Sequence, residues 1–315
     1  MINIYKKVGN ELQIIQQTEN DCWINIAPPF NMGQLEQFAK EHQIPFSYIV
    51  DCIDQFERSR YEKQDDSKLI VINTPILNEG FDLEDEATYI TIRFGIILIP
   101  NMIVTVCSVN NPLIEWFERN IHKNLDLQNR TDFVIRIFER NIYYFLHYLR
   151  EINKRISQIE KLNYSSRNQE LNKLLHLQKA LIYFVNDLRA DEMVLLKIQR
   201  NDFLEIKDDK IAKDKFEDIL IDNSQALEMA NVYSNILGNM MGAFASIISN
   251  NLGHVVNRLT AVTIALMLPT LIAGIYGMNI DLPFQHHVHA FTIVVTLSVL
   301  CSFAFVFYFR KKRWL

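Results

Sequence analysis

Polar or small side chains alternate with larger apolar ones at helical spacing in a segment near the C-terminus. Neighbouring members are three or four residues apart, which places them on one face of a helix. They are Val256, Leu259, Thr263, Met267, Thr270 and Gly274. Threonine and glycine let helices approach closely in a bilayer, so the pattern alone favours helix packing. The alternative is the lining of an ion pore, in which hydroxyl groups contact water and Leu259 and Met267 form dry constrictions.

All of these residues except Val256 belong to the first of two long uncharged runs. Residues 259–280 and 288–309 each span 22 positions without Asp, Glu, Lys or Arg. About 20 apolar residues are enough for a helix to cross the hydrocarbon core of a membrane. A soluble core helix rarely stays apolar on all sides over this length. The two runs therefore predict two membrane-spanning helices in contact with lipid.

Basic residues predict how the two helices are oriented. Arg258 precedes the first run, four basic residues follow the second at positions 310–313, and the connecting loop has no Lys or Arg. Positive charge stays on the cytoplasmic side, so we expect both chain termini in the cytoplasm and a multi-pass protein of the cell membrane. The first 257 residues carry 36 acidic and 27 basic side chains, a net charge of −9, against +4 for the rest. This balance excludes nucleic acid as the leading partner and mildly favours cations.

The pattern divides the chain into consecutive segments. Residues 1–130 mix β-branched strand-like runs with two short helical runs, which predicts an α/β or α+β domain. Residues 131–215 are helical, with Thr131 or Asp132 as the expected cap of the first helix. A helical pattern then begins near Phe216 and meets no proline before Pro269. One helix, residues 216–280, is expected to run from the cytosol into the membrane part at about 258–278. A loop at 280–287, a second membrane helix at 288–309 and a basic tail at 310–315 complete the chain.

Signatures of enzymes are missing from the sequence. It contains no phosphate-binding glycine loop, no nucleophile elbow and no HExxH motif, so we expect no enzyme activity. The four cysteines, Cys22, Cys52, Cys107 and Cys301, lie far apart without zinc-binding spacing. They are expected to be reduced and mostly buried.

The end of the first membrane run resembles a known family. The segment "PTLIAGIYGMN" closes on Gly277-Met278-Asn279, followed by a short loop, a second span and the tail "YFRKKRWL". This arrangement is similar to the CorA family of divalent-cation channels, and stretches such as "CWINIAPP" and "RNQELNKLLHLQKALIYF" extend the resemblance over the whole chain. The resemblance implies a funnel-shaped homopentamer: an α+β cytoplasmic domain folded as an α/β/α sandwich, a long stalk helix and two membrane helices. It implies passive uptake of Mg²⁺.

The resemblance also assigns roles around the pore. Gly277, Met278 and Asn279 would form the selectivity filter, where a ring of Asn279 carbonyls hydrogen-bonds to the waters that Mg²⁺ holds tightly. Gly277 would permit a backbone turn near positive φ and a close approach of subunits. Leu259 and Met267 would be the hydrophobic gate. Thr263, Thr270 and Gly274 would line the rest of the pore.

A regulatory metal site is a second implication of the resemblance. Asp218 matches the acidic residue that the family uses to bind Mg²⁺ between neighbouring subunits. Its partner is Asp65 or Asp66, and Asp65 is favoured. Cytosolic Mg²⁺ would then hold adjacent subunits closed. Without the resemblance, Asp218 reads as an ordinary carboxylate near a helix N-terminus, where the helix dipole favours negative charge.

The chain departs from the family pattern at several positions. Gly242 and Gly253 stand where the family carries polar pore rings, and the outer loop has Asp281 in place of a Pro-Glu pair. Histidines at 286, 287 and 289 suit Zn²⁺, Co²⁺ or Ni²⁺. Two alternatives to a Mg²⁺ channel therefore stay open. One is a transporter of Zn²⁺, Co²⁺ or Ni²⁺, and the other is a membrane-anchored sensor that conducts nothing.

Overall fold

The computed structural model describes most of the 315-residue chain. The described residues are 1–9, 11–55, 57–78, 87–120, 126–161, 168–278 and 288–311. They divide into two compact units, Met1–Gly238 and Asn239–Leu315. Helix α6 (Lys210–Tyr276) contributes to both units.

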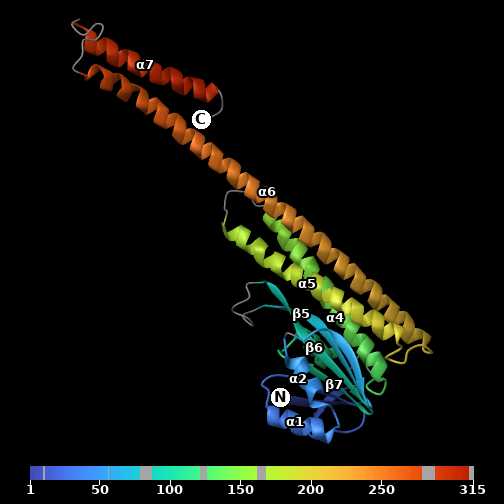
Figure 1. Cartoon of the computed structure of the whole chain (residues 1–315). Helices are drawn as coiled ribbons and strands as arrows, with labels where there is room; N and C mark the ends of the chain where they lie inside the picture. The colour runs from blue at the N-terminus through green and yellow to red at the C-terminus, as the bar shows by residue number, and fades with distance from the viewer. Residues whose placement is uncertain are drawn as a thin grey trace. The chain divides into compact units, whose positions relative to one another are not determined.

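A seven-stranded sheet forms the centre of the first unit (Figure 1). The strand order is β2-β1-β3-β7-β6-β5-β4, and all neighbours are antiparallel except the parallel pair β3 and β7. The strands are β1 (Ile2–Val8), β2 (Glu11–Ile15), β3 (Cys22–Ile26), β4 (Arg60–Gln64), β5 (Ser67–Leu77), β6 (Tyr89–Ile99) and β7 (Met102–Cys107). The central strands are almost continuously apolar because both faces of the sheet are covered.

Helices cover the two faces of this sheet. On one face, α1 (Met32–Glu41) and α2 (Phe46–Ile53) bury alternate strand residues such as Ile24, Val71 and Val104. On the other face, α3 (Pro112–Asn120), α4 (Arg130–Lys161) and α5 (Asn168–Arg200) pack against the intervening residues, and Trp23 meets the rings of Phe117 and Phe133 edge-on. The layers are therefore helix, sheet and helix, which confirms the predicted mixed α/β domain.

A buried polar cluster fastens α5 to the sheet. The carboxylate of Asp191 accepts hydrogen bonds from the Asn73 amide N–H at 3.1 Å and from the Ser59 hydroxyl at 2.8 Å. Burial raises the pKa of Asp191 well above its ordinary value, and these hydrogen bonds oppose the rise. The side chain of Asn141 on α4 donates to the Asn73 carbonyl at 2.7 Å. Helices α4 and α5 are thus both tied to β5 through Asn73.

The first part of α6 packs along the helical layer. Phe216 is fully buried and meets Phe138 of α4 edge-on, and Asn223 donates to the Leu188 carbonyl of α5 at 3.1 Å. The long uninterrupted helix expected from the sequence is present, with 67 residues. It begins at Lys210 and not near Phe216, because Asp209 caps it by accepting from the amide of Ala212 at 3.1 Å.

The cap of α4 also differs from the expectation. Neither Thr131 nor Asp132 caps this helix. The side chain of Asn129 accepts the hydrogen bond from the Asp132 amide at 3.0 Å, so the helix begins at Arg130.

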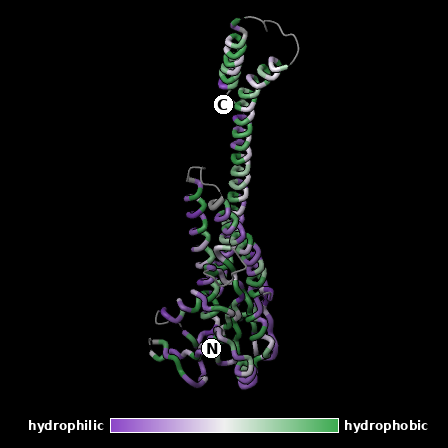
Figure 2. The backbone as a smooth tube through the Cα atoms, turned by 90° about the vertical axis from the view of Figure 1, so that its left-hand side faces the viewer, coloured by the Kyte–Doolittle hydropathy of each residue, from purple (hydrophilic) through white to green (hydrophobic). Residues whose placement is uncertain are grey.

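The second unit consists of the C-terminal part of α6 and of α7 (Ala290–Lys311). Both helices are long and apolar enough to cross a membrane, and their apolar side chains are almost wholly exposed within the chain. Figure 2 shows both segments mostly green and white, with few hydrophilic residues. A helix with this pattern requires a lipid environment or further protein around it.

Candidate ion pathway

The membrane part of α6 has one face that packs on α7. Its shielded side chains recur at spacings of three and four: Ala261, Ile264, Ala265, Leu268, Pro269 and Ile272. On α7, Ser298 is buried and Ser302 is half-buried. Small residues on both sides let the two helices approach closely, as is usual in membranes.

A hydrogen bond between the helices compensates for the proline. Pro269 has no N–H, so the carbonyl of Ala265 loses its normal donor within the helix. The hydroxyl of Ser302 lies 2.9 Å from that carbonyl oxygen and donates to it. An unsatisfied carbonyl is costly in lipid, and α7 therefore supplies the group that α6 lacks. Pro269 in the sequence predicts the unpaired carbonyl of Ala265 but not its donor, for which the serines at 298 and 302, four residues apart, are the available signal.

The opposite face of α6 is left uncovered by the residues that the structure describes. At about 100° per residue, Thr263, Met267, Thr270 and Gly274 lie roughly 140–200° around the helix from Ala265. All four are exposed, and together with Met278 they line a groove of about 570 Å³. Four of the residues named from the sequence thus share one surface, which α7 does not use. Leu259 lies outside this groove.

The threonine hydroxyls on this face have a defined hydrogen-bond polarity. Thr263 donates to the Leu259 carbonyl at 2.8 Å, and Thr270 donates to the Leu266 carbonyl at 3.0 Å. A hydroxyl has one proton and two lone pairs. With the proton used inside the helix, each threonine presents acceptor oxygen outward.

The gate candidates are large apolar side chains on the same helix. Leu259 is 67% exposed and Met267 is 63% exposed. They are separated by about two helical turns, or roughly 12 Å along the axis at 1.5 Å per residue. Apolar side chains at two levels are the arrangement that a double hydrophobic constriction requires.

The C-terminus of α6 leads into the Gly-Met-Asn motif. The Gly277 amide donates to the Ala273 carbonyl at 2.9 Å, and the Met278 amide donates to the Ile275 carbonyl at 3.2 Å. Gly277 does not use the positive φ that glycine permits, because its backbone continues the helical hydrogen bonding. The last turn contains no basic residue, so the negative end of the helix dipole is not neutralised within it.

Several predicted residues lie outside the described part of the chain. They are Asn279, Asp281, His286 and His287. His289 is described and exposed. Among the described residues, no group of three His, Cys, Asp or Glu side chains could hold a metal ion.

The candidate regulatory residues are both on the surface of the first unit. Asp218 is exposed on α6, and Asp65 is exposed with a φ of 51° in the turn between β4 and β5. The alternative reading of Asp218 as a helix N-terminal carboxylate is wrong. Because α6 begins at Lys210, Asp218 lies beyond the second turn, where the dipole effect has faded.

Gly242 and Gly253 lie within α6 on open surface. A Cβ atom added at either position would meet no heavy atom within 4 Å among the described residues. Steric crowding by the described residues therefore does not require glycine at these two positions.

Comparison with known proteins gives consistent matches. A family model described as CorA-like Mg²⁺ transporter protein matches residues 20–311. The chain is 28% identical over 307 residues to a cobalt/magnesium transport protein CorA of Methanocaldococcus jannaschii, covering 93% of this chain and 91% of that protein. It is 25% identical to a magnesium transport protein CorA of Wolinella succinogenes over the full length of both.

A solved structure shares the fold. The complete structure of the CorA magnesium transporter from M. jannaschii superposes with a TM-score of 0.81 at 23% identity, covering 100% of this chain and 99% of that one. These matches confirm the resemblance seen in the sequence. The chain belongs to the CorA-like family of Mg²⁺ transporters, a family of cell-membrane transport proteins and not of enzymes.

Proposed function

We propose that this chain forms a homopentameric channel for the uptake of hydrated Mg²⁺, with Co²⁺ as a second substrate. The observation that carries the proposal is the uncovered face of α6, where Thr263, Thr270 and Gly274 share a groove that leads toward Gly277-Met278-Asn279. In the pentamer, five copies of this face enclose the pore, and α7 lies outside against lipid.

The outward acceptors on this face suit a cation that keeps its water. A hydrated Mg²⁺ ion presents water hydrogens to its surroundings, and these need acceptors. Hydroxyl groups whose protons are already donated within the helix offer only lone pairs. At the outer mouth, the Asn279 carbonyls accept from the same hydration shell, and Asp281 adds negative charge near the entrance. The ion binds and leaves quickly because no carboxylate in the pore removes its bound waters.

Membrane potential supplies the driving force. With the basic tail and Arg258 in the cytoplasm, uptake moves two charges toward the negative side. This gains about 4.6 kcal/mol per 100 mV at roughly 2.3 kcal/mol per charge. No second ion has to be coupled to transport.

The apolar rings of Leu259 and Met267 close the pore by excluding water. A narrow apolar ring empties of water when its diameter falls slightly, and a hydrated ion cannot cross the dry gap. Small rotations of α6 are enough to change that diameter, because Met267 projects from the groove and Leu259 is exposed about two turns before it on the same helix.

Apolar residues on the first part of α6 support assembly from several copies. Ile221 is 64% exposed, and Val232 and Ile236 are also exposed. These positions precede the membrane segment, so lipid does not cover them. Further copies of the chain cover them in the homopentamer that the family resemblance implies.

Cytosolic Mg²⁺ regulates the channel between neighbouring subunits. Asp218 of one subunit and Asp65 of the next share the ion, with Asp66 as the alternative partner. Both Asp218 and Asp65 are exposed, as a site between subunits requires. Asp218→Asn is expected to weaken inhibition of flux by cytosolic Mg²⁺ without abolishing the flux.

The decisive experiment measures Mg²⁺ entry into liposomes. Purified protein is reconstituted with a Mg²⁺-sensitive dye inside, and an inside-negative potential is imposed. We expect Asn279→Ala to abolish selective influx and Thr270→Val to reduce it severalfold. Thr296→Val is the matched control, because its hydroxyl also donates within its helix, at 2.7 Å to Thr292, but it lies on α7.

The outcomes separate the alternatives. Zn²⁺ entry without Mg²⁺ entry would assign the chain to Zn²⁺ transport and would be tested further at His286 and His287. Absence of flux for every divalent cation would support the non-conducting sensor and make Gly242 and Gly253 the first positions to examine. Equal loss in Thr270→Val and Thr296→Val would contradict a pore on this face of α6.

A further inference from the structure

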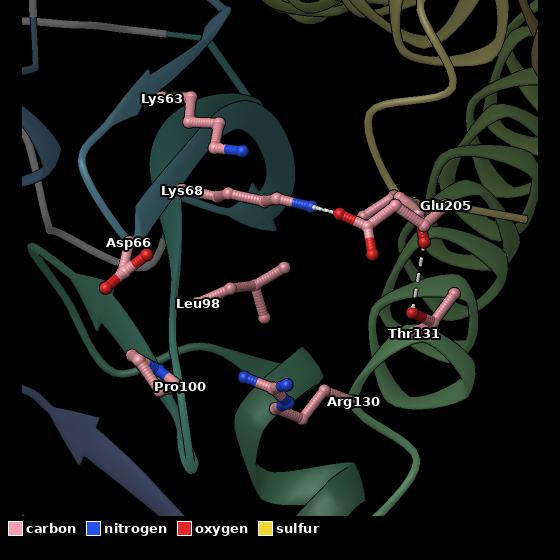
Figure 3. Close-up of a pocket in the computed structure, with 9 residues that line it drawn as sticks. Lys63, Asp66, Lys68, Leu98, Pro100, Arg130, Thr131 and Glu205 are labelled. Carbon is pink, nitrogen blue, oxygen red and sulfur yellow. Dashed lines mark hydrogen bonds and ion pairs between the residues drawn. The ribbon is translucent and has the colours of Figure 1, made fainter.

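A cationic cavity lies in the first unit, apart from the candidate ion pathway. Its volume is about 260 Å³, and its charged lining residues are Lys63, Asp66, Lys68, Arg130 and Glu205. Figure 3 shows the two lysine amino groups and the Arg130 guanidinium extending from different elements into the same space. Three positive and two negative groups leave the lining with a formal charge of +1. This cavity is smaller than the roughly 300 Å³ at which pockets for drug-sized ligands begin. It suits a small ligand or one group of a larger one.

Two of the cations are held together by the register of a hairpin. Lys63 on β4 and Lys68 on β5 are direct cross-strand partners, so their side chains leave the same face of the sheet. Like charges directly opposite each other destabilise a strand pair. The side chain of Lys68 is mostly buried, with 18% of its surface exposed. Lys63 forms no ion pair with any of the described residues. The hairpin therefore holds two cations side by side, and Asp66 of the turn between them also lines the cavity.

The third cation enters from a helix terminus. Arg130 is the first residue of the 32-residue helix α4, and its guanidinium donates to the carbonyl of Ile99. A carbonyl positions the guanidinium but leaves its charge uncompensated. The positive end of the α4 dipole adds to the same field.

Glu205 interacts electrostatically with all three cations. Its carboxylate accepts a hydrogen bond from Lys68 at 2.7 Å. That hydrogen bond and the Lys68 charge lower the pKa of Glu205, and Lys63 and Arg130 add to the effect. The side chain of Glu205 is nevertheless 75% exposed, in a turn where its φ is 57°. An exposed side chain can swing out, whereas Lys68 is also held by the Phe203 carbonyl at 2.8 Å.

We propose that this cavity is a binding site for a phosphate group, in which Lys63, Lys68 and Arg130 bind the anion and Glu205 is the internal competitor that it displaces. A tetrahedral oxyanion matches three converging cations, and arginine recognises phosphate oxygens with two parallel N–H groups. Leu98 and Pro100 form the apolar side of the lining.

The test is calorimetric titration of the full-length, detergent-solubilised protein with inorganic phosphate. Ionic strength is held constant with chloride, and the buffer contains no Mg²⁺, because the turn between Lys63 and Lys68 carries the candidate regulatory residue Asp65. The result is then independent of the proposed channel function. We expect saturable binding of phosphate that chloride does not reproduce, and at least tenfold weaker binding in Arg130→Gln.

Glu205→Gln distinguishes loss of the competing carboxylate from damage to the fold. Removing the competing carboxylate should tighten phosphate binding severalfold, whereas a damaged fold would weaken it. Lys40→Gln is the matched control, since Lys40 is exposed on α1 and pairs with Glu36 at 2.7 Å away from the cavity. It should leave the affinity unchanged.

Two results would overturn the proposal. One is the absence of phosphate binding beyond the chloride background, and the other is unchanged or weaker binding in Glu205→Gln. A parallel titration with adenosine monophosphate identifies the source of the phosphate. Tighter binding than inorganic phosphate assigns the site to phosphate esters, and equal or weaker binding assigns it to free phosphate.

Discussion

Replacing Ser302 with alanine should destabilise the packing of α7 on α6. The Ser302 hydroxyl donates to the Ala265 carbonyl at 2.9 Å and lies 3.1 Å from the Ser298 carbonyl in its own helix. Alanine keeps the small volume that the interface needs but removes the donor. The Ala265 carbonyl then has neither the hydroxyl nor an amide from Pro269.

The size of the effect follows from this missing donor. Hydrogen bonds between membrane helices contribute about 0.6 kcal/mol on average and up to about 1.7 kcal/mol. The average is low because the freed group usually finds another partner. Here the normal intrahelical partner is absent, so we expect a loss near the upper end, about 1.5 kcal/mol of unfolding free energy.

A double-mutant cycle with Pro269→Ala isolates the cause. Alanine at position 269 restores an amide that can donate to the Ala265 carbonyl, so Ser302→Ala in this background should cost less than about 0.5 kcal/mol. The expected coupling is about 1 kcal/mol. Equilibrium unfolding in mixed micelles measures all four proteins, with Thr296→Val as the control for loss of a hydroxyl on α7. Equal costs of Ser302→Ala with and without Pro269 would refute the reasoning.

Two further predictions concern the first unit. Burial alone would raise the pKa of Asp132, but hydrogen bonds from Arg136 at 2.6 Å and Lys215 at 2.7 Å outweigh it and lower the pKa. The stability that the ionised Asp132 contributes is present above the unfolded pKa near 3.8 and is lost as pH falls through the lower folded pKa. Acid unfolding curves of Asp132→Asn should therefore show a smaller loss of stability as the pH falls below 3.8. Gly95→Ala should lower the unfolding free energy by about 1–3 kcal/mol in a denaturant titration, because its Cβ would lie 2.0 Å from the sulfur of Cys52. An unchanged stability would show that α2 shifts freely, contrary to its packing.

The sequence predicted five of the seven strands and missed one edge strand and one interior strand. The apolar β-branched runs "ELQIIQ", "CWINI", "KLIVINTPI", "TYITIRFGIILI" and "MIVTVCSV" correspond to β2, β3, β5, β6 and β7, which are all present. Strands β1 and β4 were not predicted. β4 reads "RYEKQ" and pairs on one side only, so its exposed positions carry charges instead of the apolar pattern. Edge strands form because a partner strand is available, and a single-sequence pattern does not contain that information.

The start of α6 was misplaced for a related reason. The run before Phe216 is rich in Asp and Lys, which resembles a loop by composition. Its charges are instead the solvent face of two helical turns that begin at the Asp209 cap. This error made Asp218 look like a carboxylate of the first turn. Correct placement of the cap removes that explanation for Asp218 and leaves its charge exposed on the helix surface.

The cationic cavity could not be predicted from spacing at all. Lys68 and Glu205 are 137 residues apart, and Arg130 reaches Ile99 across 31 residues. Only the assembled layers bring the β4–β5 hairpin, the start of α4 and the loop before α6 together. Motif reading detects chemistry carried by one segment, such as Gly277-Met278-Asn279, and misses chemistry that depends on topology.

The membrane part of α6 shows how the two kinds of information combine. The spacing alone allows a stripe of threonine, methionine and glycine either to pack against another helix or to line a pore. Packing is the more common use, so the pattern alone favours it. The structure supplies the missing fact that α7 packs on the other face, where Ser302 of α7 donates to the carbonyl of Ala265. The close packing that small residues permit is therefore already provided by that face. The threonine face is left with outward acceptors and no partner in the described chain, which is the condition that a pore-lining surface has to meet.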